Sequence, residues 1–180
     1  MDKTAIQAAR DSMGRAEAAV HNIEHADSFE ELEAAWSDFL VMANRVYTKL
    51  EQGSKVNPKS ITWFGLKKYE RRKDQLLKYI KNARDADEHG LKRVTEREPG
   101  RTLIASGLIE AVDGHTIRLT PESMRQPKIT VGTSPARVVL VEVTNYGDKY
   151  QPPNDTSPLS VAQKAILHLR SLIAEAEGLS

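Results

Sequence analysis

Residues 28–50, SFEELEAAWSDFLVMANRVYTKL, carry the most regular apolar pattern of the chain. Apolar side chains recur there at intervals of three and four, which is the spacing of one face of an α-helix, at Phe29, Leu32, Trp36, Phe39, Ala43, Val46 and Leu50. Ser28 and Glu31 form a capping-box pattern, in which a hydroxyl and a carboxylate accept hydrogen bonds from free backbone N–H groups. The stretch therefore predicts a long helix that packs against its neighbours at a shallow crossing angle.

Further helices are predicted on both sides of this stretch. The first 25 residues repeat the same spacing at Ile6, Ala9, Met13, Ala16, Val20 and Ile23. A loop follows at EQGSKVNPKS (51–60), where glycine, proline and small polar residues gather. A third, long helix is predicted from Ser60 to His89, because Gly90 can take the left-handed conformation that ends helices.

Beyond Pro99 the pattern changes to that of β-strands. Asp113-Gly114 suits a tight hairpin turn, and KITVG (128–132) and ARVVLVEVTNY (136–146) add two candidate strands. The second is almost continuously apolar, which favours a central place in a small antiparallel sheet. A turn-rich segment, YQPPNDTSPLS (150–160), precedes a last helix from about Ser160.

This order of elements predicts an α+β fold: an N-terminal antiparallel helical bundle, a small antiparallel β-sheet appendage and a closing C-terminal helix. We expect residues 1–93 to form the bundle, and residues 94–180 to form a β-rich region with the last helix, packed on the same unit.

Composition excludes several classes of function. The 180 residues are 39% hydrophobic and 28% charged, as in ordinary globular proteins. Because the chain has no cysteine, it has no disulfides, thiolate nucleophiles or cysteine-bound zinc. The first residues lack the apolar core of a signal peptide, and no apolar run approaches the ~18 residues of a membrane span. We expect a cytoplasmic protein that does not enter a membrane.

The charges are unevenly distributed along the chain. The net charge is −4 over residues 1–58, with six basic and ten acidic residues, and +6 over residues 59–93, with eleven and five. Such asymmetry can mark an anionic partner such as RNA. Attraction between acidic and basic helices of one bundle accounts for it equally well.

The end of the third predicted helix, NARDADEHGL (82–91), is unusually polar. Helical geometry places Arg84 and Asp87 within the apolar stripe, whereas Asp85 and His89 project toward the opposite side. One explanation is structural: Arg84 pairs with Glu88 and Asp85 with His89, each four positions apart, and His89 is favoured near the negative end of the helix dipole.

The same residues have a second interpretation. Arg84-Asp85-Ala86-Asp87-Glu88-His89 resembles the R-x4-6-H signature of the HEPN superfamily, with a polar residue directly after the arginine. The resemblance covers roughly residues 1–93. It implies a helical bundle with the motif near the end of a long helix, and a metal-independent RNase of a toxin–antitoxin, anti-phage or CRISPR system. It also implies a homodimer whose two motifs meet, with an antitoxin as a further protein partner.

The resemblance assigns roles to three residues. Arg84 would hold a phosphate with its planar fork of donors, and His89 would exchange protons with the ribose hydroxyl or the leaving oxygen. Asp85 would orient or polarise these two. RNA-backbone binding is predicted for basic residues of the same helix, which otherwise form a solvated face: Lys67, Lys68, Arg71, Arg72, Lys78 and Lys81.

Two further residue patterns give weaker indications of a site. His21 and His25, four positions apart, can chelate a metal together with a further ligand such as Glu24. The favoured interpretation is that they are two exposed histidines without a metal. We therefore expect neither a metal site nor a cofactor. Trp36 and Trp63 lie in apolar patterns and are expected in the core.

Three hypotheses of function follow. The first is the HEPN-like endoribonuclease. The second is a non-catalytic regulatory or interaction protein of a mobile element or defence operon, in which Arg84 and Asp87 are structural. The third is an RNA-binding module that does not cleave.

Overall fold

The computed structural model describes residues 1–89, 93–105, 111–112, 116–117, 130–134 and 136–180, with side chains for 1–88, 93–100 and 136–180. The chain divides into two compact units. The helical unit comprises Met1–Glu96 and Val139–Ser180, and the β unit comprises Arg97–Val138. The fold is α+β, with an N-terminal antiparallel helical bundle, a β appendage and a closing C-terminal helix, as predicted.

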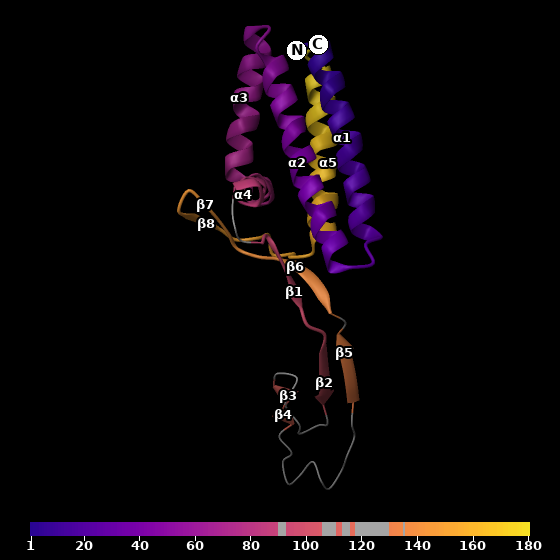
Figure 1. Cartoon of the computed structure of the whole chain (residues 1–180). Helices are drawn as coiled ribbons and strands as arrows, with labels where there is room; N and C mark the ends of the chain where they lie inside the picture. Colours follow the sequence, from indigo (N-terminus) through magenta and orange to yellow (C-terminus); the bar gives the residue numbers. More distant parts are fainter. Residues whose placement is uncertain (90–92, 106–110, 113–115, 118–129, 135) are drawn as a thin grey trace. The chain divides into compact units, whose positions relative to one another are not determined.

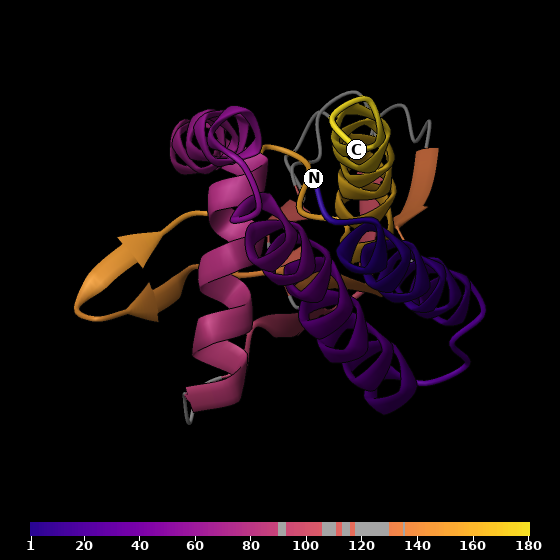
Figure 2. The same cartoon turned by 90° about the horizontal axis from the view of Figure 1, so that it is seen from above.

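Three long helices form the body of the helical unit. They are α1 (Lys3–Glu24), α2 (Phe29–Ser54) and α5 (Pro158–Glu177), and they lie side by side in both views (Figures 1 and 2). Both chain ends lie at one end of this bundle, where the Met1 ammonium donates to the Leu179 carbonyl at 2.7 Å. The last helix, separated from α1 in sequence by more than half of the chain, therefore completes the same core.

The predicted apolar seam of α2 forms the centre of that core. Trp36, Phe39 and Leu50 have no exposed surface, and Leu169 and Leu172 of α5 are 1% exposed. Burying each such side chain contributes about 1.5–3 kcal/mol. The helices also approach closely at Gly53, where an added Cβ would lie 2.3 Å from the Cβ of Ala5.

The predicted start of α2 is confirmed. The Ser28 hydroxyl accepts from the N–H of Glu31 at 3.1 Å. The Glu31 carboxylate accepts from the N–H of Asp27 at 2.9 Å, one residue before the cap. The box thus satisfies one free donor of the first helical turn and one backbone donor just before the cap.

The single helix predicted over 60–89 is wrong, because the structure has two. They are α3 (Pro58–Lys73) and α4 (Gln75–His89), separated by Asp74. The N–H of Asp74 donates to the Glu70 carbonyl at 2.9 Å, and its carboxylate accepts from the N–H of Leu77 at 2.8 Å. Asp74 therefore ends one helix and caps the next, and α4 runs across the long axes of the other helices (Figures 1 and 2).

The break changes which apolar residues are buried. Leu66 and Tyr69, counted as part of a continuous stripe in the sequence, are both 60% exposed on α3. Tyr79, Ile80 and Ala83 of α4 belong to the core, and α4 packs against α2.

The strands form two-stranded pairs. In the β unit, β2 (Arg101–Ala105) pairs antiparallel with β5 (Thr130–Ser134), and β3 (Ala111–Val112) with β4 (Thr116–Ile117). The β3–β4 pairing fits the predicted hairpin, although Asp113 and Gly114 lie outside the described residues. Where the chain leaves and rejoins the helical unit, β1 (Thr95–Glu98) pairs with β6 (Arg137–Leu140).

The central strand predicted over 136–146 is wrong. The structure breaks it into β6 and β7 (Val143–Asn145), and β7 pairs only with β8 (Asp148–Tyr150) among the described strands. Leu140 and Val143 belong to the core of the helical unit, so this apolar run covers helices and does not fill the middle of a sheet. The β7–β8 turn has positive φ at Tyr146 and Gly147, as in a type I′ hairpin.

A bilayer-spanning helix needs about 20 mostly apolar residues. Within the described residues, every helix falls short of this in length or in apolar character.

Candidate functional site

A cleft of about 600 Å³ lies among α2, α3 and α4 of the helical unit. We call it the basic cleft. Its walls consist of Asn44, Tyr47, Thr48 and Glu51 from α2, Phe64, Lys68, Arg71 and Arg72 from α3, Lys78, Lys81, Asn82 and Asp85 from α4, and Tyr150 from β8. This volume is within the range of pockets that bind small molecules or short polymer segments.

Positive charge exceeds negative charge in the basic cleft, with five cations against two carboxylates. Lys68 pairs with Glu51 at 3.0 Å, and Lys81 pairs with Asp85 at 3.2 Å. Among the described residues, no carboxylate lies within ion-pair distance of the other three cations, Arg71, Arg72 and Lys78. The walls therefore keep an excess of three positive charges for an anion.

Arg71 is the most constrained of these cations. Its Nη2 donates to the Asn44 side-chain oxygen at 2.9 Å, and its guanidinium lies 3.9 Å from the centre of the Tyr47 ring. Its Nε is buried and has no hydrogen-bond partner in the described part of the chain. Burial lowers the pKa of Arg71, but an arginine remains charged at neutral pH.

The phenol of Tyr47, against which the Arg71 guanidinium lies, does not neutralise the charge of Arg71. Burial raises the pKa of Tyr47 to about 12, against a smaller opposing effect of Arg71. Tyr47 is therefore uncharged at neutral pH and acts as an aromatic platform for the guanidinium.

The structure brings together five of the six basic residues predicted to bind RNA. Lys68, Arg71 and Arg72 come from α3, and Lys78 and Lys81 from α4. They converge because the chain turns at Asp74, where the sequence pattern predicted a continuous helix.

Lys67 is the sixth basic residue and lies apart from the basic cleft. It pairs with Glu70 at 3.0 Å and with Glu175 at 2.9 Å. Burial acts to lower the pKa of Lys67, but hydrogen bonds to the two carboxylates outweigh it and raise the pKa. Its charge is thus already satisfied within the protein.

The polar end of α4 is a network of ion pairs. Arg84 contacts Glu88 at 2.6 Å and Asp85 at 3.1 Å, so the predicted pairing of Arg84 with Glu88 is present. Asp85 also accepts from the side chains of Lys81 at 3.2 Å and Asn145 at 3.3 Å. Burial opposes ionisation of Asp85, but the hydrogen bonds from Arg84 and Lys81 hold its pKa below the usual range.

The residues of the HEPN-like motif occupy different surroundings. Asp85 lines the basic cleft, and Asp87 accepts a hydrogen bond from Ser37 of α2. Arg84 is three-quarters buried, and its Nε has no hydrogen-bond partner among the described residues. His89 is the last residue of α4, and its side chain lies outside the described part of the chain.

The α2 wall of the cleft was not predicted from the sequence. Asn44, Tyr47, Thr48 and Glu51 follow one another at helical spacing, next to the apolar seam of α2. A polar stripe bordering an apolar one was the available signal. The spacing of this polar stripe does not show which other helix or strand faces it.

His168 extends the cluster behind the basic cleft. Its Nε2 lies 2.8 Å from the Tyr47 hydroxyl, and burial lowers the pKa of His168 below its ordinary value. The unfolded chain, in which a histidine titrates near ~6.5, therefore binds this proton more readily than the folded one. Stability contributed by neutral His168 is lost as the pH falls below about 6.5.

We expect the melting temperature to fall as the pH is lowered from 7.5 to 5.5, and the fall to be smaller in His168→Gln, which keeps a polar partner for Tyr47. Carboxylates with lowered pKa, such as Asp85, begin to lose their contribution only at about pH 5, below this window. Circular dichroism melts at three pH values test the expectation. Parallel curves for both proteins would contradict it.

No family model, curated protein or solved structure matches the chain.

Proposed function

We propose that the protein binds single-stranded RNA, and that the basic cleft holds the phosphate backbone. The observation that carries the proposal is Arg71, a partly buried guanidinium without a carboxylate partner among the described residues, in a cleft with three excess positive charges. Arginine presents a planar fork of donors that matches phosphate oxygens.

The cations of the basic cleft come from two helices. Arg71 and Arg72 lie on α3, whereas Lys78 lies on the next helix, as binding of more than one phosphate of a strand requires. A single strand also fits a cleft of this size, and proteins that bind single strands combine such basic grooves with aromatic rings. Tyr150, half-buried at the cleft wall beside Lys78, offers such a ring.

A second candidate function is the HEPN-like, metal-independent endoribonuclease, with Arg84 binding phosphate, Asp85 orienting it and His89 in acid/base catalysis. The observation in its favour is Arg84, whose buried Nε lacks a hydrogen-bond partner among the described residues and whose Nη1 contacts Asp85 of the cleft wall. Against it, two carboxylates already contact Arg84.

One experiment tests both functions. Fluorescence anisotropy follows binding of a labelled 12-nucleotide RNA from 50 to 200 mM salt with chelator present, and the RNA is then run on a denaturing gel. Three phosphate contacts predict a slope of log Kobs against log salt of about −2, from about 0.7 per contact. Saturable, salt-dependent binding with intact RNA supports the first function.

The other outcomes are equally specific. Fragments that form with the wild type and are absent with His89→Ala support the nuclease. DNA of the same sequence, bound as tightly as RNA, would change the ligand to single-stranded nucleic acid in general. No saturable binding at 50 mM salt would contradict both proposals.

A further inference from the structure

The last turn of α1 carries three side chains able to bind a metal. They are His21, Glu24 and His25, all exposed, and one ligand atom from each lies within 4.8 Å of the others. The two imidazole rings have centroids 4.1 Å apart. We propose that these three residues, which we call the α1 cluster, bind Zn²⁺. This inference is independent of the proposed RNA binding.

The spacing of the α1 cluster suits zinc. Positions three and four apart lie on the same face of a helix, so His21 brings both other side chains to one side. Tetrahedral zinc with bonds of about 2.0–2.2 Å needs its ligand atoms roughly 3.3 Å apart. Because the side chains are exposed, their rotamers are free to change toward this separation.

A backbone hydrogen bond prepares one of the histidines. His25 Nδ1 lies 2.9 Å from the carbonyl oxygen of His21. A neutral His25 that donates from Nδ1 to this carbonyl keeps the lone pair on Nε2 for a metal. Zinc-binding histidines in general donate from their second nitrogen in this way, which sets the tautomer and the ring orientation.

The helix itself favours a cation at this place. His21 lies in the last turn of α1 and His25 is its C-cap, where unpaired carbonyls carry partial negative charge. Glu24 adds a carboxylate. A divalent cation is therefore attracted by the carboxylate and by the helix end, in addition to the two nitrogen ligands.

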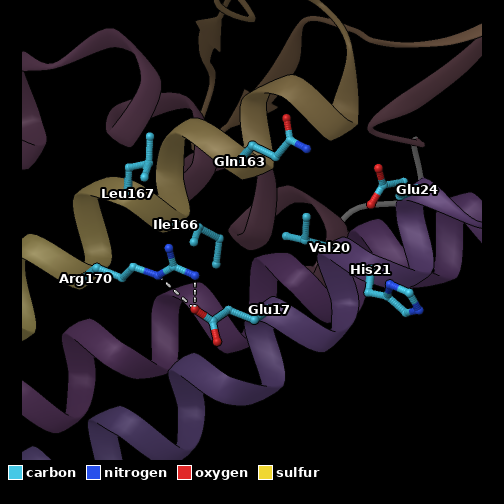
Figure 3. Close-up of a pocket in the computed structure, with 8 residues that line it drawn as sticks. All are labelled: Glu17, Val20, His21, Glu24, Gln163, Ile166, Leu167 and Arg170. Atoms are coloured by element: carbon cyan, nitrogen blue, oxygen red, sulfur yellow. Dashed lines mark hydrogen bonds and ion pairs between the residues drawn. The ribbon is translucent and has the colours of Figure 1, made fainter.

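A pocket lies next to the α1 cluster. Figure 3 shows this pocket, of about 340 Å³, between α1 and α5, lined by His21 and Glu24 together with Val20, Gln163, Ile166 and Arg170. Glu17 also lines it, but Arg170 holds its carboxylate at 2.6 Å, which excludes Glu17 as a free ligand. Three protein ligands leave a fourth position for water or a ligand group. His21 and Glu24 border the pocket, whereas His25 is not one of its lining residues.

Isothermal titration of the full chain with ZnCl2, after removal of trace metal, tests the inference. Because the chain has no cysteine, thiolates cannot contribute to the signal. We expect one saturable site in the wild type. Changing a partner of a metal ligand already weakens binding about 10–100-fold, so His21→Gln and His25→Gln, each of which removes a direct ligand, should weaken it at least tenfold.

His168→Gln is the matched control. It also removes a histidine, but one that is half-buried and bonded to Tyr47, so it should bind zinc like the wild type. Circular dichroism checks that all variants are folded. The two cluster variants are expected to fold because residues 21 and 25 are exposed. Absence of saturable binding in the wild type, or equal binding by the wild type and both cluster variants, would overturn the proposal.

Discussion

Arg71→Ala should weaken binding of single-stranded RNA roughly tenfold to hundredfold, because a hydrogen bond to a charged group contributes about 1.5–3 kcal/mol. The guanidinium lies in the basic cleft, contacts Asn44 and covers the ring of Tyr47. Removing it deletes one of the three cations of the cleft that no carboxylate of the described residues pairs. The salt slope should also become shallower by about 0.7, since one phosphate contact is lost.

Two further variants give this prediction its controls. Arg71→Lys keeps the charge but loses the planar fork, so its affinity should lie between those of the wild type and Arg71→Ala. Lys67→Ala removes the same charge from the same helix outside the cleft, where Lys67 is held by Glu70 and Glu175, and should leave the affinity within about twofold. Equal losses for Arg71→Ala and Lys67→Ala would mean that a diffuse charge, and not the cleft, binds the RNA.

Trp36→Ala should lower the free energy of unfolding by about 3–5 kcal/mol, the usual cost of deleting a buried aromatic ring. Trp36 has no exposed surface and stacks on Phe39 in the centre of the core. In a chain of this size, each kcal/mol corresponds to about 2–4 °C, so the melting temperature should fall by roughly 6–20 °C. Urea unfolding measures the change in free energy directly.

Trp63→Ala is the comparison for this prediction. Trp63 is only partly buried at the edge of the core, and its indole N–H donates to Glu175 at 3.1 Å. Its loss should cost clearly less than that of Trp36, because part of the ring already contacts water. If the two variants lost equal stability, the core would not be centred on α2 as the structure describes.

Local patterns in the sequence predicted much of the fold. The apolar spacing of α1 and α2 is visible in short windows, and each of these helices buries most of the face that the spacing predicts. The last helix was also predicted, from about Ser160. The start of α2 was predicted from two residues, Ser28 and Glu31, because a capping box needs only neighbours in the chain.

The errors lie where burial depends on distant residues. Asp74 stands in a segment that reads as one helix, but α4 turns there and buries Tyr79, Ile80 and Ala83 in the core. The apolar run 136–146 reads as a central strand, but Leu140 and Val143 pack on the helices. In both cases the local pattern shows only that the side chains are apolar. Which helix or strand they pack against depends on residues distant in the sequence.

The sequence by itself determined the α+β class, the helices of the bundle, the cap of α2 and a concentration of basic residues around 59–93, because each depends on neighbours in the chain. Only the tertiary structure decided that α3 and α4 meet at an angle, that five of these basic side chains line one cleft with α2, and that Lys67 is held elsewhere by Glu175. The physical reason is that a charge is available to a ligand only when no residue of the fold already neutralises it, and those residues come from distant parts of the chain.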